Sequence, residues 1–337
     1  MVSLKVYIIT RLLMTIPMIL ILLTLVFFIM RILPGDPVLA IVGMKASPEQ
    51  IERIRHELGL DKDWLHQYID YITMVFSGNL GNSMIWGRRP VINEIWDRFP
   101  ATLELSIGGF IVSVILGLLT GVFSSIKQGT KTDVGLRLFS IIAYSLFIPL
   151  LGMIFQLIFG VYLRLFPVAG RKSPLISITW YTGLYTIDSL LSGSILGFFD
   201  AIWHLILPSL TLGIVLSGVY TRLVRSSMLD VLAEDFIRAL RARGIPENSV
   251  LFKHALKNAF IPILTMMGLQ FALLLAGAVL TETTFSWPGV GTFLMERIEY
   301  RDYTTVQGTI VFYAFLVALV SLIVDIIYAY IDPRIRY

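Results

Sequence analysis

The 337-residue sequence contains no cysteine. Disulfide bonds, cysteine-ligated zinc, iron–sulfur clusters and thiol nucleophiles are therefore all excluded. Histidine is also scarce: the four histidines lie far apart along the chain, and neither HExxH nor HxxEH occurs. These two patterns hold zinc on a helix in many hydrolases. The composition therefore excludes sulfur chemistry and lacks the common signatures of a metalloenzyme.

Charged residues are few as well. They make up 15% of the sequence, against roughly 25% in soluble globular domains. Hydrophobic residues make up 56%, and the mean hydropathy is +0.79. About 20 apolar residues in a helix cross the ~30 Å hydrocarbon core of a bilayer. We therefore predict an all-α integral membrane protein. The net charge of +4 is too small to indicate a nucleic-acid partner.

Six apolar stretches are long enough to cross a membrane, and we predict a helix at each. The first follows Lys5 and Arg11, as in a secretory signal peptide, but no small-residue cleavage site comes after it. We expect it to be retained as an uncleaved anchor. The predicted spans are Leu12–Met30, Thr102–Phe123, Leu138–Leu163, Leu205–Val224, Phe260–Val279 and Val306–Tyr330.

Six crossings place both termini on the same side of the membrane. That side holds fourteen Lys or Arg and six Asp or Glu, whereas the other side holds thirteen basic and fifteen acidic residues. Because basic residues gather on the cytoplasmic side, we predict that both termini are cytoplasmic. Residues 1–100 then form one helix and an extracytoplasmic segment. Residues 101–331 form a five-helix transmembrane domain with a cytoplasmic loop at about 225–258.

The extracytoplasmic segment contains a helix start. Residues 47–50 read SPEQ, which fits a capping box with proline at the first helical position. Ile51, Ile54 and Leu58 then share one face, and Gly59 provides a helix end. We predict a short amphipathic helix on the outer side of the membrane.

Signals for catalysis are weak. The dipeptide Gly-Lys does not occur, which excludes the GxxxxGK loop that binds ATP phosphates, and the hydrolase pattern GxSxG is absent. Two acids, Glu104 and Asp325, fall in predicted spans, where a buried charge is costly. Both lie near a span end, so a structural role is favoured for each. A proton-coupled carrier or channel remains open as an alternative, and a membrane enzyme is the least favoured class.

One long polar segment, EDFIRALRARGIPENSVLFKHALKNAFIPIL, interrupts the apolar pattern from Glu234 onward. Residues 230–243 are good helix formers, and they place Ala233, Ile237 and Leu240 on one helix face. A solvated loop, a catalytic site and a docking surface for another protein are the three possible explanations of this segment.

The segment contains a defined corner. A helix end is predicted at Gly244, because glycine adopts the left-handed conformation that closes many helices. Pro246 and Glu247 then begin a second helix, in the order that helix starts prefer. We expect Arg238 to contact either a partner protein or an acid such as Glu234, four residues earlier. The segment contains no glycine besides Gly244, so it is too ordered for a flexible connector.

This segment resembles the cytoplasmic loop of ATP-binding-cassette (ABC) importer permeases. Their pattern is EAA, three residues, glycine, nine residues and I-x-L-P. With Gly244 as that glycine, residues 238–240 (RAL) fall on EAA, and His254, Leu256 and Lys257 fall on I, L and P. The glutamate and the proline of the general pattern are therefore replaced here.

The peptide-transport branch of the family is more similar. Its first permease subunit carries EDY-I-R-x-A-R-A-K-G and HALRNA-x-x-P, where this chain has EDFIRALRARG and HALKNAFIP. The resemblance extends along the whole chain through LPGDP, RFPATLELS, HLILPSLTLG, ETTFSWPGVG, RDYTTVQG and the terminal DPRIRY, in the family's order and spacing.

The resemblance implies a type I ABC importer permease fold with six transmembrane helices. The chain would form half of the translocation pathway in a prokaryotic cytoplasmic membrane, beside a second homologous permease subunit. Two cytoplasmic ATPases would bind ATP and Mg²⁺, so this chain would be no enzyme and would hold no cofactor. An extracytoplasmic binding protein would deliver dipeptides or oligopeptides, with oligosaccharides, nickel and glutathione as the alternatives.

In such permeases the break at the glycine is a coupling helix that inserts into a groove of one ATPase. The resemblance assigns no residues to catalysis, to a metal or to the substrate pathway. It assigns contact with the ATPase to ten residues of this chain: Glu234, Asp235, Arg238, Ala239, Arg241, Gly244, Ile245, Pro246, Glu247 and His254.

Overall fold

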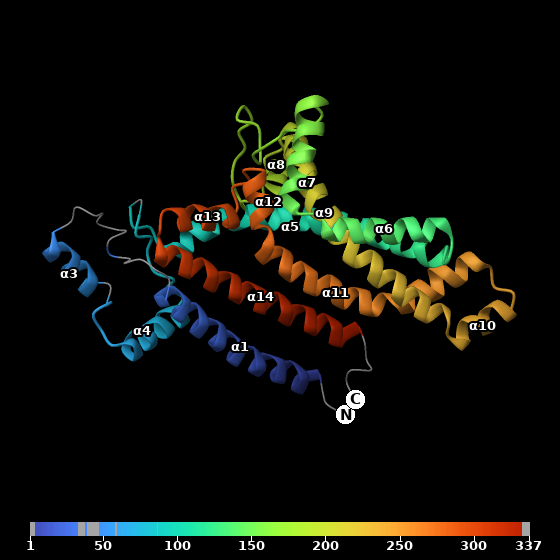
Figure 1. Ribbon diagram of the computed structural model, residues 1–337, viewed down its shortest axis with the longest axis horizontal. Coiled ribbons are helices and arrows are strands. Elements are labelled where there is room, and N and C mark those ends of the chain that lie inside the picture. The colour runs from blue at the N-terminus through green and yellow to red at the C-terminus, as the bar shows by residue number, and fades with distance from the viewer. Residues whose placement is uncertain (1–3, 33–37, 39–46, 58, 86, 332–337) are drawn as a thin grey trace.

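The computed structural model describes residues 4–32, 38, 47–57, 59–85 and 87–331. Long helices lie side by side in an elongated bundle, and shorter helices lie at its ends and on its side (Figure 1). The described residues contain no β-structure beyond one isolated bridge between Asn82 and Pro90. The helices are α1 (Leu4–Ile32), α3 (Pro48–Glu57), α4 (Trp64–Phe76), α5 (Val91–Ile126), α6 (Lys131–Ser145), α7 (Ile148–Phe155), the π-helix η1 (Gln156–Tyr162), α8 (Tyr185–Leu191), α9 (Ile195–Leu232), α10 (Asp235–Ala242), the π-helix η2 (Ser249–Ala255), α11 (Leu256–Gly277), α12 (Val279–Thr284), α13 (Val290–Glu299) and α14 (Tyr303–Ile331).

Five helical stretches of the described residues are long and apolar enough to cross a membrane. There are six crossings if the bent pair formed by α6 and α7, with its π-helical extension, counts as one span. The five stretches overlap five of the predicted spans, which confirms the all-α class and these positions. They are Ile9–Ile29, Val91–Ile126, Ile195–Leu232, Ser249–Leu275 and Tyr303–Ile327.

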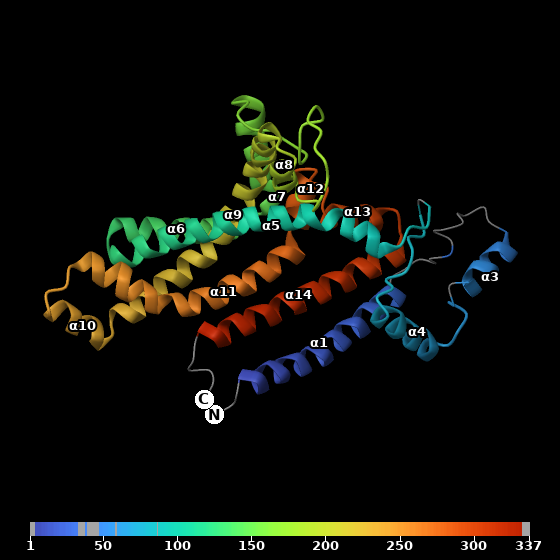
Figure 2. The same ribbon diagram turned by 180° about the vertical axis from the view of Figure 1, so that it is seen from behind.

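The span predicted over Leu138–Leu163 corresponds to the bent pair and is not one continuous helix. α6 ends at Ser145, α7 begins at Ile148, and the two helices are bent by 102° relative to each other. Pro149 explains the break, because it has no N–H to donate to the carbonyl of Ser145 and its ring would clash with that group. α7 consequently projects from the side of the bundle (Figures 1 and 2).

α5 and α9 form the centre of the bundle and lie against each other along much of their length. Glycine permits this approach. A β-carbon on Gly117 would overlap the side chain of Tyr220, and one on Gly121 would overlap Val224. Small residues at i and i+4 allow membrane helices to pack closely where lipid provides no hydrophobic driving force. Tyr220 and Val224 are consequently buried.

The first turns of α1 and the last turns of α14 lie at the same end of the bundle (Figure 1). There Arg11 Nη1 lies 3.5 Å from the carboxylate of Asp325, which supports the structural role favoured for this acid. α10 and the connection between α5 and α6 extend at this end, whereas α3, α4 and α13 lie at the opposite end (Figures 1 and 2). If the termini and the 225–258 loop are all cytoplasmic, they must lie at the same end of the bundle, as they do here.

The helix predicted in the extracytoplasmic segment is present as α3. The Ser47 N–H donates to Gln50 Oε1 at 3.2 Å, and the Gln50 N–H donates to Ser47 Oγ at 3.3 Å, which confirms the capping box. Gly59 has a φ of +63°, as expected for a residue that closes a helix. The predicted apolar face includes Leu58, which lies outside the described residues.

The orientation can be tested with single cysteines, because the native chain has none. Ser77 and Asn248 are both exposed and lie in the outer and inner connections respectively. In intact cells, an impermeant maleimide should label Ser77→Cys and leave Asn248→Cys unmodified until the membrane is permeabilised. If only Asn248→Cys were labelled in intact cells, the chain would have the opposite orientation to the one assigned here.

Candidate functional site

The polar segment leaves α9 earlier than the sequence predicted. Residues 230–243 do not form one helix: α9 and α10 are separate, and Glu234 between them is extended, with φ −71° and ψ 151°. This change of direction turns Ile237 back toward the bundle, where it is fully buried. Ala233 lies before the break and is exposed, so it does not share the buried face as predicted.

α10 packs on the end of the bundle through one apolar face. Ile237 belongs to a buried cluster with Met228 of α9 and Val250 of the following helix, and Leu240 packs against the same cluster. Full burial of an isoleucine side chain contributes about 1.5–3 kcal/mol. The short α10 is therefore held by both neighbouring helices, so it is no solvated loop.

Gly244 closes α10 as predicted. Its φ is +74°, which confirms the left-handed conformation. The Gly244 N–H donates to the carbonyl of Arg241 at 3.0 Å, and the Ile245 N–H donates to the carbonyl of Leu240 at 3.3 Å. These two hydrogen bonds form the Schellman motif. In this motif the residue after the glycine usually also makes an apolar contact with the residue whose carbonyl it bonds, here Ile245 with Leu240. Here Leu240 and Ile245 both pack on the buried cluster.

A salt bridge spans the turn. Arg241 donates to both carboxylate oxygens of Glu247, at 2.6 and 3.1 Å. The hydrogen bond raises the pKa of Arg241 and lowers the pKa of Glu247. The contribution of the pair is therefore present at neutral pH and is lost only as the pH falls through the lowered pKa of Glu247. Both side chains are about half exposed, so the pair adds little to stability.

Arg238 contacts an acid, as expected, but this acid is Asp235 and not Glu234. Glu234 lies outside the helix, so the i, i+4 geometry does not exist, and Arg238 Nη1 lies instead 3.2 Å from Asp235. The side chains of Arg238 and Asp235 are 73% and 95% exposed. α10 thus presents a charged outer face of both signs, opposite the apolar face that packs on the bundle.

The second helix begins where the sequence placed it. The N–H groups of Ser249 and Val250 donate to the carbonyl of Pro246 at 2.8 and 3.1 Å, and the chain is helical from Glu247. It continues through η2 into α11 without a break, with Val250 and Ala255 fully buried. The corner is therefore connected on both sides to helices that cross the bundle.

The structure places the ten assigned residues along one continuous stretch of the inner end. Ile245 and His254 are half-buried, and His254 lies farther along the second helix than the corner itself. The exposed residues are Glu234, Asp235, Arg238, Ala239, Arg241, Gly244, Pro246 and Glu247.

Sequence reasoning missed a buried ion pair at this end. Asp133, in the first turn of α6, is almost fully buried and accepts two hydrogen bonds from Arg225 of α9, at 2.8 and 3.0 Å. Ser124 Oγ and the Gly129 N–H also donate to it, at 2.6 and 3.0 Å. The pair joins the α5–α6 connection to α9. An acid within a basic loop was the only sign of it in the sequence.

Another buried carboxylate joins two distant motifs near α13. Glu282 accepts hydrogen bonds from Thr102 Oγ1 at 2.6 Å and from the N–H groups of Gly291 and Thr292 at 2.7 and 3.0 Å. The Val290 N–H donates to Thr102 Oγ1 at 2.8 Å. A carboxylate at a helix N-terminus satisfies N–H groups that have no partner within the helix. RFPATLELS and ETTFSWPGVG thus form one structural unit.

Glu104 is also paired. Arg171 donates to it through Nε at 2.8 Å, and Thr186 donates through both its N–H and its hydroxyl, at 2.8 and 2.6 Å. Both members of the ion pair are buried. These contacts tie the loop between η1 and α8 to α5, which supports the structural role favoured for Glu104.

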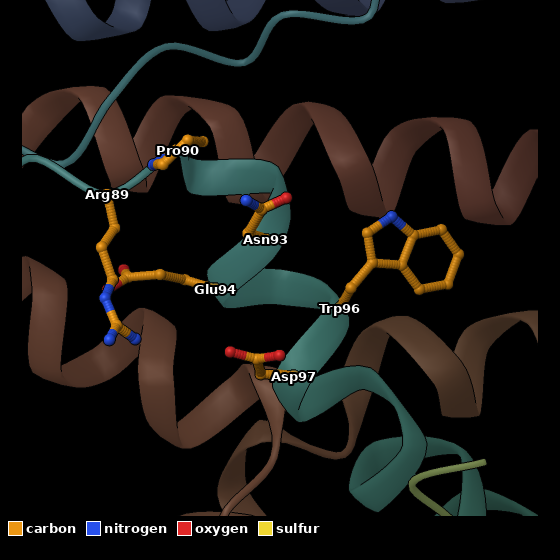
Figure 3. Close-up of a pocket in the computed structure, with 6 residues that line it drawn as sticks. All are labelled: Arg89, Pro90, Asn93, Glu94, Trp96 and Asp97. Carbon is orange, nitrogen blue, oxygen red and sulfur yellow. The ribbon is translucent and has the colours of Figure 1, made fainter. Parts of the chain in front are cut away.

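A pocket of about 400 Å³ opens at the outer end of α5 (Figure 3). Its lining combines one guanidinium, two carboxylates, an amide and an indole. Of these groups, the buried Glu94 pairs with Arg297 at 3.0 Å. The described residues contain no cluster of three or more side chains that could hold a metal ion. The pocket is lined by Arg89, Pro90, Asn93, Glu94, Trp96 and Asp97.

Comparison with known proteins places the chain in a family. Residues 113–337 match the family described as "binding-protein-dependent transport system inner membrane component", and residues 4–106 match the N-terminal part of the membrane component of such systems. Together the two matches cover nearly the whole chain.

Several relatives are similar over almost their full length. The di/tripeptide transport system permease protein DppB of Pseudomonas aeruginosa (strain UCBPP-PA14) is 45% identical, over 93% of each chain. The dipeptide transport system permease protein DppB of Escherichia coli (strain K12) is 41% identical over 98% of each chain. The glutathione transport system permease protein GsiC of Escherichia coli O6:H1 is 40% identical, over 98% of this chain and 99% of the relative.

A solved structure shares the fold. The MetNI methionine ABC transporter, in its inward-facing form, gives a TM-score of 0.53 at 16% sequence identity. The similarity covers 72% of this chain and 96% of that one. The chain therefore belongs to the inner-membrane components of binding-protein-dependent transport systems, the permease subunits of ABC importers, and is a multi-pass protein of the bacterial cytoplasmic membrane.

Proposed function

We propose that this chain forms half of the translocation pathway for dipeptides or oligopeptides in an ATP-driven importer. A second homologous permease subunit completes the pathway, and an extracytoplasmic binding protein delivers the substrate. Two cytoplasmic ATPases bind ATP and Mg²⁺, while this chain is no enzyme and holds no cofactor. Residues 1–100 form its N-terminal unit and residues 101–331 its transmembrane domain.

Peptides are the substrate class that the relatives favour. Relatives that are 40–45% identical are named for di- or tripeptides, and these matches cover more than 90% of this chain. Glutathione is the second candidate, because a relative that is 40% identical carries that name.

The observation that carries the coupling role is the construction of the corner at Gly244. Motion of an ATPase surface reaches the spans only through an element that is both rigid and continuous with them. α10 has these properties: Ile237 fixes it to α9 and η2, the Schellman turn fixes its end, and the second helix then continues through η2 into α11. Its exposed charged face, with Arg238 and Asp235, is then available to the ATPase groove.

Reconstitution tests the proposal. The purified chain alone should hydrolyse no ATP, because it has no phosphate-binding loop. The assembled complex in proteoliposomes should take up a labelled dipeptide when its binding protein and ATP are present, and blocked ATPase subunits should stop that uptake. Hydrolysis by the single chain at the rate of the complex, or uptake without the ATPases, would contradict this assignment.

A further inference from the structure

α4, in the extracytoplasmic segment, has an apolar face that nothing in the described structure covers. Leu65, Ile69 and Phe76 are 64%, 52% and 56% exposed, and Trp64 at the start of the helix is 60% exposed. Leu65, Ile69 and Phe76 lie at i, i+4 and i+11, so they share one side of the helix. Contiguous exposed apolar surface of this kind marks contact with a membrane or with another protein.

The opposite side of α4 is already occupied. Tyr71 and Val75 are buried in one cluster with Leu23 and Phe27 of α1. The hydroxyls of Tyr68 and Thr24 lie 2.7 Å apart, which adds a polar contact between the two helices. The exposed apolar side of α4 is therefore not needed to hold the helix on the bundle.

The uncovered face is continuous with the surfaces of two spans. The Trp64 ring lies 6.3 Å from Phe28 of α1, and the Phe76 ring lies 6.5 Å from Phe315 of α14. In the most apolar stretch of each of these two spans, only 17% of the residues are buried by the rest of the chain. On α1, the exposed apolar surface at Phe28 continues to the exposed Leu25.

The charged groups of α4 lie on another side. Asp70 follows Ile69 but points to a different face, where Lys62 Nζ reaches its carboxylate at 2.7 Å, and both side chains are more than half exposed. His66 pairs with Asp63 at the start of the helix and is likewise exposed. α4 thus has one protein-facing side, one polar side and one uncovered apolar side.

We propose that α4 lies in the outer lipid interface, with Leu65, Ile69 and Phe76 in contact with acyl chains and Asp70 facing water. Amphipathic helices bind bilayers in this way, with tryptophan at the level of the headgroups. Lipid is the occupant because the patch continues the surfaces by which α1 and α14 face the membrane. α4 then anchors the extracytoplasmic segment beside the outer end of α1.

The position of α4 can be measured independently of transport. Leu65→Cys and Asp70→Cys, on two different faces of α4 in the cysteine-free chain, are labelled with an environment-sensitive fluorophore in the assembled complex in nanodiscs. A phosphatidylcholine with a nitroxide at carbon 5 serves as the lipid-borne quencher, and iodide serves as the aqueous quencher. ATP hydrolysis by each labelled complex shows that it is folded.

The label at Leu65 should emit at shorter wavelength and lose most of its fluorescence to the nitroxide lipid, with little loss to iodide. The label at Asp70 should show the reverse. Strong iodide quenching at Leu65 would overturn the proposal, since α4 would then lie in water. Protection of Leu65 from both quenchers would overturn it as well, because another protein chain would then cover this face.

Discussion

Replacement of Gly244 by valine should reduce coupled transport at least about tenfold and leave the subunit folded. At a φ of +74° a β-carbon costs about 1–2 kcal/mol, and the branched valine costs more. No atom lies within 4 Å of the position a β-carbon would take, so the cost is backbone strain and not a clash with the core. A strain of about 1.4 kcal/mol lowers the population of the native corner about tenfold relative to a distorted one. We therefore expect peptide uptake per ATP hydrolysed to fall by at least about tenfold.

A graded series and a matched control separate coupling from general strain. Gly244→Asn should transport almost as wild type, because asparagine tolerates the left-handed conformation, and Gly244→Ala should fall between asparagine and valine. Gly193 has a φ of +71°, with no atom within 4 Å of a β-carbon, and lies in the turn between α8 and α9. The Gly193→Val variant carries the same backbone strain outside the polar segment, so its peptide uptake should equal that of the wild type.

The readout is uptake and ATP hydrolysis in proteoliposomes, together with retention of the ATPases on the purified permease. Arg238→Ala should have a milder effect, because its exposed contact with Asp235 contributes little. Normal uptake by Gly244→Val with its ATPases still bound would show that the corner does not couple the two activities.

Replacement of Glu282 by alanine should have the largest effect on stability. Its carboxylate is fully buried and satisfies the Thr102 hydroxyl and the N–H groups of Gly291 and Thr292. Each buried donor left without a partner costs about 1–3 kcal/mol. The sum approaches the total of about 5–15 kcal/mol that stabilises a typical domain. We expect Glu282→Ala to aggregate on purification in detergent.

Glu282→Gln tests whether the hydrogen bonds are responsible. Glutamine has the same shape but keeps only one acceptor oxygen and turns an NH₂ group toward existing donors. It should purify with a lowered melting temperature. Glu299→Ala, at an exposed site of the same α13 region, should match the wild type. Size-exclusion profiles and thermal melting measure all three variants, and a Glu282→Ala protein with wild-type melting would contradict the structural role of this carboxylate.

The sequence alone determined features that depend on local chemistry. Five of the six predicted spans were located, because crossing a bilayer requires only a long enough apolar run. The capping box at Ser47 and the left-handed turn at Gly244 were also predicted correctly, since each depends on a few neighbouring residues and on the freedom of glycine at positive φ. The motifs of the polar segment and their order along the chain indicated the family.

Hydropathy and helix propensity gave the wrong shape at two places where the chain changes direction. Pro149 and Glu234 both interrupt helices that composition favours: Pro149 removes a hydrogen bond between α6 and α7, and the extended Glu234 separates α9 from α10. An apolar window favours helix on both sides of Pro149, and helix propensity favours it on both sides of Glu234, but neither measure predicts a change in helix direction. Only the packed structure shows that α7 turns by 102° and that Ile237 reaches the buried cluster.

The partners of the buried acidic side chains were decided by tertiary structure alone. Asp133 and Arg225 are 92 residues apart in sequence, and Thr102 and Glu282 are 180 apart. No local pattern specifies such pairs, because each depends on which helix faces meet when α5, α6, α9 and α12 pack together. Burial in a low-dielectric interior then makes each pairing obligatory, since an unpaired charge there would cost several kcal/mol.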